Sequence, residues 1–235
     1  IEKKEKAADV SKSLVPFLMS TAIIGVLIIF QPDIGTLGII ALTGAIIYFL
    51  AGAKISHFII IGILGLAALL ILIKTAGYRM DRLTVFLHPE IEPQGIGYQI
   101  NQALLAIGSG GLFGRGLGHS LQKWQYLPEP ISDSIFAIAA EELGLMGAFV
   151  LMTLFIIFAW RGFKIAKQAP DGFGQLLAVG ITGWLVFQAF INIAAISGLI
   201  PLTGIPLPFI SYGGSAMAVS LAAVGILVNV SKYTN

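Results

Sequence analysis

The stretch "SIFAIAAEELGLMGAFVLMTLFIIFAW", residues 134–160, decides the fold. It carries only two charged residues, Glu141 and Glu142, and it is long enough to cross a bilayer core, which takes roughly 17–25 helical residues. Five further stretches are similarly apolar: residues 13–30, 34–50, 56–73, 173–197 and 207–230. The sequence therefore predicts an all-α fold, a polytopic membrane bundle of about six transmembrane helices.

The composition supports a membrane protein and excludes several other classes. Hydrophobic residues make up 57% of the chain and charged residues 11%, whereas soluble domains are about 25% charged. Cysteine is absent, which excludes disulfides and thiolate metal sites within this sequence. The net charge is only +2 and no basic cluster is present, so we expect no nucleic-acid partner. The three histidines lack metal-ligand spacing, and no zinc site is predicted.

The distribution of Lys and Arg predicts the orientation of the chain in the membrane. Most of the 14 basic residues precede the first span, follow the sixth, or lie between the second and third or the fourth and fifth. By the positive-inside rule both termini are then cytoplasmic, and residues 74–133 form a large extracytoplasmic loop within a single membrane domain, residues 1–235. The charged stretch at residues 1–12 lacks the order of a secretory signal, and we interpret it as a cytoplasmic loop of a longer protein.

Two irregular features lie outside the regular spans. Residues 100–107 are apolar with helical periodicity but too short to cross, which favours a re-entrant or interfacial helix. The sixth span opens with "LTGIPLPFISYGGSAM", residues 202–217, where two prolines and a Gly-Gly pair interrupt any helix. Non-helical backbone at membrane depth must be buried in protein or line a polar cavity. We therefore expect a discontinuous sixth helix whose residues 206–214 line such a cavity.

Asp133 stands immediately before the fourth span and allows two interpretations. As a helix cap, its carboxylate would accept hydrogen bonds from free backbone N–H groups and suit the helix dipole. As a general base at the outer membrane surface, it would be ionised at neutral pH and made more basic by partial burial. The two interpretations are compatible.

Glu141 and Glu142 lie inside the fourth span, where carboxylates are functional candidates. At about 100° per residue, Glu141 lies near the helix face of Asp133, whereas Glu142 lies almost opposite. Glu141 is therefore expected to share a cavity with Asp133. The alternative is that both are structural carboxylates bonded to Gln188, Asn192 or the backbone of neighbouring helices.

The glycine-rich stretch "GSGGLFGRGLG", residues 108–118, matches no Walker A pattern and lacks a strand–helix context. It is better explained as an outer loop carrying Arg115. Together with Lys123, Arg79 and Arg82, this residue could neutralise a diphosphate, or all four could simply be solvated loop cations.

Four blocks of the sequence resemble the SEDS family (shape, elongation, division and sporulation), which includes FtsW, RodA and SpoVE. They are "QPDIGT" (residues 31–36), "GIGYQINQALLAIGSGGLFGRGLGHSLQKWQYLPEP" (95–130), "SDSIFAIAAEELG" (132–144) and "GLIPLTGIPLPFISYGGSAM" (198–217). The segments "QKWQYLPEP" and "GIPLPFISYGG" are more similar to the FtsW branch than to the RodA branch. Members of the family have ten spans, and this chain resembles the last six.

The resemblance implies a GT-C-like peptidoglycan glycosyltransferase that polymerises lipid II. The family's catalytic aspartate falls at Asp133. The family's His-Thr-Asp-Phe reads Ile131-Ser132-Asp133-Ser134 here, so the role of that histidine cannot be carried over. Gln125 stands where many relatives have an acidic residue, which weakens a second-carboxylate or metal proposal there.

The expected machinery is then one general base, Asp133, together with positive charge for the departing diphosphate, supplied by cations or by a divalent metal ion. The expected substrate-binding residues are Arg79, Arg115, Lys123, Gln125, Glu129, Glu141, Ser211, Gly213 and Gly214. The expected partners are lipid II, the class B penicillin-binding protein of division and other divisome proteins, at the bacterial cytoplasmic membrane. Two alternatives remain open: a transporter that flips lipid II, and a scaffold that recruits division proteins.

Overall fold

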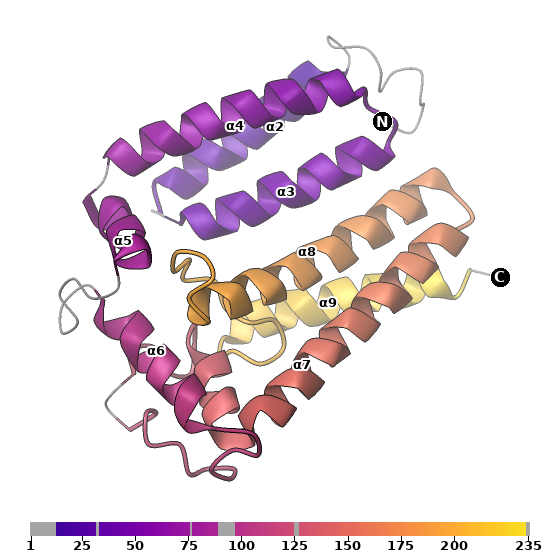
Figure 1. The fold of residues 1–235 in the computed structure, drawn as a ribbon. Helices are drawn as coiled ribbons and strands as arrows, with labels where there is room; N and C mark the ends of the chain where they lie inside the picture. The colour runs from indigo at the N-terminus through magenta and orange to yellow at the C-terminus, as the bar shows by residue number, and fades with distance from the viewer. Residues whose placement is uncertain (1–12, 32, 76, 89–96, 125–126, 234–235) are drawn as a thin grey trace. The chain divides into compact units, whose positions relative to one another are not determined.

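The computed structural model describes residues 13–31, 33–75, 77–88, 97–124 and 127–233. All regular elements in these ranges are helices, and none is a strand (Figure 1). The helices are α2 (Val15–Ile29), α3 (Ile34–Leu50), α4 (Ile55–Thr75), α5 (Gly77–Leu87), α6 (Tyr98–Ser109), α7 (Ile135–Gln168), α8 (Gly172–Ile196) and α9 (Gly214–Ser231). The predicted all-α class is confirmed.

Each of the six apolar stretches forms a helix, and four of these helices have the length and composition to cross a membrane. These four are α4, α7, α8 and α9. Helices α2 and α3 are equally apolar but have 15 and 17 residues. At 1.5 Å per residue they extend roughly 22–26 Å, somewhat less than the ~30 Å hydrocarbon core. The chain is thus an all-helical multi-pass membrane protein, while the orientation of its termini and loops stays a prediction.

Two compact units make up the chain, and each is described by itself. The first contains the residues up to Leu72, Phe158–Leu185 and the residues from Leu221 on. The second contains Ile73–Ile157 and Val186–Ser220. The expectation of one membrane domain over residues 1–235 stays a prediction.

The first unit contains a buried chain of hydrogen bonds between side chains. The hydroxyls of Ser13 and Tyr48 lie 2.9 Å apart, and the Tyr48 hydroxyl lies 2.7 Å from His57 Nδ1. Phe17 of α2 stacks on the Tyr48 ring of α3, with ring centroids 4.8 Å apart. These polar side chains bond to one another, which lowers the cost of burying them between apolar helices.

The core of the second unit combines small and large apolar residues. Alanines on α6, α7 and α8 allow close approach of the helix backbones, and larger side chains fill the space between them. The buried members are Ala103, Ala106, Leu127, Phe136, Ala137, Ile138, Ala140, Ala148, Phe155, Ala189, Ile193, Ile196 and Leu207. This core supports the start of α7, where Asp133 lies.

Helix α7 is interrupted at Gly144, whose backbone angles are φ 70° and ψ −171°. In an uninterrupted helix the N–H groups of Leu145 and Met146 would donate to the carbonyls of Glu141 and Glu142. Instead they donate to the carbonyls of Gly111 and Leu112, at 2.9 and 3.1 Å.

The freed carbonyls of α7 are satisfied by the same loop. Those of Glu141 and Glu142 each accept a hydrogen bond at 3.0 Å, from the N–H groups of Arg115 and Gly116 respectively. Residues 111–116 therefore provide new partners for all four backbone groups of the two broken helical hydrogen bonds.

The start of the sixth span differs from the prediction. Residues 201–213 form no helix, and α9 begins at Gly214 and runs without interruption to Ser231. The prediction of a helix beginning at residue 207 is wrong. Pro206 and Pro208 have no backbone N–H to donate, and Gly204 and Phe209 have φ angles of 70° and 66°, which a right-handed helix excludes.

Candidate functional site

Asp133 lies in a tight turn that leads into α7. The carbonyl of Glu129 accepts hydrogen bonds from the N–H groups of Ser132 and Ser134, at 3.3 and 3.2 Å. Glu129 itself has a left-handed φ of 47°. The fully buried Ser134 hydroxyl donates to the carbonyl of Pro128 at 3.0 Å. The turn fixes the backbone of Asp133 before the first residue of the helix.

Two side chains from distant segments hold this turn from the other side. The Asn192 Nδ2 amide on α8 donates to the carbonyl of Asp133 at 2.8 Å and to that of Ile205 at 2.7 Å. The Ser211 hydroxyl donates to the carbonyl of Ser132 at 2.6 Å and accepts from the N–H of Leu207 at 2.7 Å. Helix α8 and the segment of residues 205–211 are thus both hydrogen-bonded to the turn, at the backbone carbonyls of Ser132 and Asp133.

The Asp133 carboxylate itself is half-buried and lightly engaged. Its Oδ1 accepts a hydrogen bond from the Ser132 hydroxyl at 2.9 Å. No backbone N–H within the described ranges donates to it, and Ser134, not Asp133, directly precedes the first helical residue. In the described residues, therefore, the geometry of a helix cap is not present at Asp133.

Gly204 brings a cation and this carboxylate to the same point. A Cβ atom built on Gly204 would lie 3.4 Å from Asp133 Oδ2 and 3.7 Å from Arg82 Nη2. Arg82 Nη1 donates to the carbonyl of Leu202 at 3.2 Å. Asp133 and Arg82 approach the glycine without forming an ion pair within 4.0 Å of each other, so both charges remain available to a ligand.

Two cavities of the second unit adjoin these groups, and both are lined by Arg82 and Leu202. The smaller, about 20 Å³, is mainly polar, and Asp133, Asn192, Gln99 and Gly204 are in its lining. Asn192 Oδ1, which is buried, has no hydrogen-bond partner among the described residues. The larger cavity, about 260 Å³, is mainly apolar. A mainly polar compartment and a mainly apolar one therefore share an arginine.

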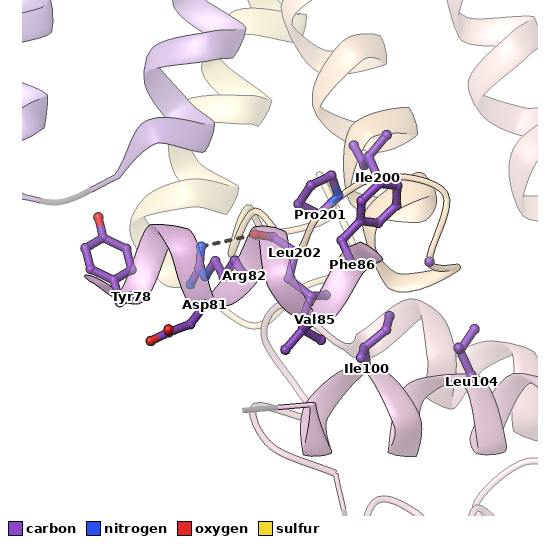
Figure 2. Close-up of a pocket in the computed structure, with 11 residues that line it drawn as sticks. Tyr78, Asp81, Arg82, Val85, Phe86, Ile100, Leu104, Ile200, Pro201 and Leu202 are labelled. Atoms are coloured by element: carbon purple, nitrogen blue, oxygen red, sulfur yellow. Dashed lines mark hydrogen bonds between the residues drawn. The ribbon is translucent and has the colours of Figure 1, made fainter. Parts of the chain in front are cut away.

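Figure 2 shows how the larger cavity is built. Phe86 projects from α5 toward the segment containing Ile200, and Val85 projects from α5 toward Ile100 of α6. The Arg82 guanidinium reaches the carbonyl of Leu202 along the dashed line. Short helices of the predicted outer loop thus supply two walls, and the non-helical segment before α9 supplies a third.

The other predicted cations lie elsewhere. Arg79 is buried, donates from Nε to the Tyr78 hydroxyl at 2.8 Å, and lines neither cavity. Arg115 Nη1 lies 3.7 Å from Glu141 Oε1, and Lys123 Nζ lies 2.7 Å from Glu142 Oε1. Of the four loop cations, Arg82 is the one beside Asp133.

Glu141 does not share a cavity with Asp133, contrary to the expectation from helical periodicity. Its fully buried carboxylate accepts hydrogen bonds from the Ser120 hydroxyl and from the N–H groups of Leu121 and Gln122. Asp133 precedes the helix, so a rotation of 100° per residue does not relate the two side chains. Glu141 and Glu142 bond to the loop at residues 118–123 rather than to Gln188 or Asn192, and direct contact of Glu141 with a substrate stays a prediction.

The remaining predicted residues that the structure describes do not line either cavity. Ser211 acts through its backbone partners, and Glu129 contributes its carbonyl while its residue is exposed. Gly213 and Gly214 lie beyond the segment that forms the walls, which is residues 200–204 rather than 206–214. Gln125 lies outside the described residues. Direct substrate contact by these residues stays a prediction.

Sequence reasoning missed three participants and undervalued a fourth. Gln99, Asn192 and Gly204 were not identified as site residues, and Arg82 was only one of four cations. A polar residue such as Asn192 inside an apolar span was the available signal. Nothing in the sequence distinguished Gly204 from the many other glycines.

The described residues contain no group of three or more His, Asp or Glu side chains that could hold a metal ion.

Comparisons with known proteins agree with this architecture. A model of the FtsW/RodA/SpoVE family, described as "Cell cycle protein", matches residues 1–235. The chain is 46% identical over 233 residues to stage V sporulation protein E of Bacillus subtilis, covering 99% of this chain and 64% of that protein. It is 37% identical to a probable peptidoglycan glycosyltransferase FtsW of a Geobacter species, covering 98% and 63%.

Solved structures give the same result. A chain from "Structural coordination of polymerization and crosslinking by a peptidoglycan synthase complex" matches with a TM-score of 0.74 at 26% identity, covering 92% of this chain and 60% of that one. A mutant of the rod shape determining protein RodA from Thermus thermophilus matches with a TM-score of 0.61, also at 26% identity, covering 93% and 56%. The chain spans 56–64% of the length of these relatives. Because the family model matches the chain from end to end, this protein belongs to the FtsW/RodA/SpoVE family of membrane proteins, the SEDS family.

Proposed function

We propose that the protein containing this chain is a peptidoglycan glycosyltransferase that polymerises lipid II into β-1,4-linked glycan strands. The observation that carries the proposal is the convergence on Gly204, beside a cavity, of the Asp133 carboxylate and the Arg82 guanidinium, which form no ion pair with each other. The relatives named as FtsW carry glycosyltransferase in their names, which supports the same reaction class.

Asp133 serves as the general base in this proposal. The 4-hydroxyl of the acceptor sugar attacks the anomeric carbon of the donor, forming the new C–O bond as the bond to the diphosphate breaks. Asp133 takes the hydroxyl proton, and the lipid diphosphate departs with the bonding electron pair. A single displacement converts an α-linked donor into a β-linked product. A positioned base of this kind contributes roughly 10²–10⁴-fold.

Arg82 serves as the cation beside the leaving group. A diphosphate is already a good leaving group, so charge stabilisation is more useful than a strong general acid. A guanidinium can hold two phosphate oxygens at once through parallel N–H donors. Its hydrogen bond to the Leu202 carbonyl holds it in place, which reduces the reorganisation needed during the reaction.

The cavities suit the two chemical ends of such a substrate. The small polar cavity is lined by Asp133, Asn192 and Gln99, polar side chains of the kind that bind a sugar. The larger, apolar cavity of about 260 Å³ is also lined by Arg82, and the first isoprene units would follow the diphosphate there. Because ligand pockets usually enclose about 300–1,000 Å³, most of the substrate would lie outside these cavities.

We further propose that the protein works in cell division with a class B penicillin-binding protein and other divisome proteins. The similarity to relatives named FtsW supports a division role, although the similarity to stage V sporulation protein E points equally to sporulation. The matched structure of a complex for polymerization and crosslinking supports a crosslinking partner of this kind. On this proposal the site faces outward from the bacterial cytoplasmic membrane.

The test uses the full-length protein purified with its penicillin-binding partner and fluorescent lipid II. We expect glycan strands that a muramidase digests. The same preparation in liposomes reports translocation of fluorescent lipid II across the bilayer. Translocation without polymer would replace the glycosyltransferase by a transporter, and neither activity would favour a scaffold.

A further inference from the structure

The loop of residues 110–124 presents large apolar side chains to its surroundings. Phe113 is 81% exposed, Leu117 74% and Trp124 68%, and Leu112 and Leu121 are exposed as well. Residues in a long extracytoplasmic loop would ordinarily face water, where such a concentration of apolar side chains is unfavourable. Within the described residues, none of these five side chains is buried in the second unit.

The position of the loop along α7 indicates what covers these side chains. After the kink, α7 is uncharged from Leu145 to Trp160, roughly 24 Å at 1.5 Å per residue, and Arg161 follows. With Arg161 at one boundary of the ~30 Å hydrocarbon core, Leu145 and Met146 lie close to the other boundary, on its apolar side. The loop carbonyls of Gly111 and Leu112 are hydrogen-bonded to these same two residues, which fixes this part of the loop at the boundary.

The apolar surface is continuous across this junction. Leu112 and Phe113 of the loop adjoin Leu145 and Met146, which are exposed, and Phe149 one turn further along α7 is exposed too. A face of a spanning helix that is apolar and exposed is the face that lipid covers. The loop extends that face beyond the end of the span.

The two cations of the loop are paired with carboxylates, which lowers the cost of placing them near lipid. Arg115 pairs with Glu141 and Lys123 with Glu142, so each cation brought to the boundary is offset by a carboxylate. Lys123 Nζ also lies 5.9 Å from the centre of the Trp124 ring. A tryptophan beside a lysine is typical of the membrane–water interface.

We infer that residues 112–124 insert their apolar side chains into the outer boundary of the lipid bilayer, and that Glu141 and Glu142 hold the loop on α7 in this position. The ligand is the acyl and headgroup boundary of the leaflet itself. This inference concerns a different surface from the candidate site, and its test does not depend on catalytic activity.

The test places a nitroxide on a cysteine in an otherwise cysteine-free full-length protein, in vesicles of phosphatidylethanolamine and phosphatidylglycerol. The two test variants are Phe113→Cys and Leu117→Cys. Phe149→Cys, on the exposed face of the span, is the lipid reference, and Gln168→Cys, at the exposed end of α7, is the water reference. Collision rates are measured with oxygen, which concentrates in lipid, and with a water-soluble nickel chelate. Only variants that elute as a single species are compared.

Insertion predicts that oxygen collisions exceed nickel collisions at both test positions, as at Phe149→Cys but at shallower depth. Nickel access equal to that at Gln168→Cys would place the loop in water and overturn the inference. Exclusion of both reagents would show that protein covers the loop, from other spans of the chain or from a partner, and would overturn it equally.

Discussion

Arg82 and Asp133 approach the same glycine without pairing, and this separation gives each residue its own task. An ion pair would consume the basicity of the carboxylate and the charge of the guanidinium. Gly204 tolerates the φ of 70° that the backbone adopts beside both side chains, a conformation that other residues rarely adopt. The reacting groups of a substrate would lie beside this glycine.

Replacing Arg82 tests the charge assigned to the leaving group. We expect Arg82→Gln to reduce lipid II polymerisation by roughly 10²–10³-fold, the usual cost of losing one donor to a developing anion. Arg82→Lys should recover part of the loss, because it keeps the charge but not the paired donors. The control is Arg161→Gln, which removes a cation from the end of α7 predicted to be cytoplasmic. Equal activity of Arg82→Gln and Arg161→Gln would remove Arg82 from the mechanism.

Asn192 is a positioning residue for Asp133, since it bonds the backbone of Asp133 rather than its carboxylate. Asn192→Asp keeps the shape but removes both N–H donors, leaving the carbonyls of Asp133 and Ile205 unpaired. Each unpaired buried carbonyl costs about 1–3 kcal/mol, so we expect a lower thermal midpoint. The turnover number should fall more than the apparent substrate affinity, because a displacement of about 1 Å can cost 10²-fold in rate. A fall in stability without a change in turnover number would show a structural role alone.

Among the elements, the kinked part of α7 and the loop hydrogen-bonded to it form one structural unit. Gly144 breaks two hydrogen bonds of the helix, residues 111–116 replace them, and the two carboxylates just before the kink fasten residues 118–123. This arrangement explains why two glutamates occur inside an apolar span. Both carboxylates hold a loop against the helix.

The hydrogen bonds between the loop and the two glutamates predict different effects of replacing each glutamate. Glu141→Gln would place an amide donor against the N–H and hydroxyl donors that the buried carboxylate now satisfies. We expect it to destabilise the protein by about 1–3 kcal/mol and to expose residues 118–123 to a protease. Glu142→Gln is the matched control. The Glu142 carboxylate is partly exposed, so water can bond to the groups that lose it as a partner. Cleavage at the same rate in both variants would contradict the assigned role of Glu141.

Particular residues show how far an element can be predicted from sequence. The apolar run of residues 134–160 identified α7, because a long uncharged stretch has few alternatives to a helix. The kink was not predicted, since glycines also occur in regular transmembrane helices and only the contacts of Gly144 with the loop distinguish it. The expected discontinuity of the sixth span was correctly placed near Pro206, but its extent depends on φ angles at Gly204 and Phe209 that the sequence does not specify.

The candidate site was predictable only in part for a similar reason. Asp133 was found through its motif, and the short helix at residues 98–109 through its periodicity. The sequence could not distinguish Arg82 from Arg79, Arg115 and Lys123. What sets Arg82 apart is that it lies beside Gly204, which is far from it in the sequence. Contacts between residues more than a hundred positions apart depend on tertiary packing, which local patterns do not encode.

At the scale of the whole molecule, orientation in the membrane decides whether the site can meet extracytoplasmic lipid II. The distribution of Lys and Arg predicts that residues 74–133 face outward and that the end of α7 faces the cytoplasm. A cysteine replacing His88 should react with an impermeant maleimide added outside intact cells, whereas one replacing Gln168 should react only after permeabilisation. Both residues are exposed in the structure. The reverse pattern would invert the topology and place the site on the cytoplasmic side.

Asp133→Asn tests whether the Asp133 carboxylate is the general base. The amide keeps the size of the side chain and can still accept from the Ser132 hydroxyl, but it cannot take a proton from the acceptor sugar. The measurement is the rate of lipid II polymerisation by the full-length variant with its penicillin-binding partner, after monodisperse elution and partner binding have been verified. The account predicts a folded, partner-bound protein with polymerisation reduced by roughly two to four powers of ten. Polymerisation by Asp133→Asn at the rate of the unsubstituted protein would contradict it.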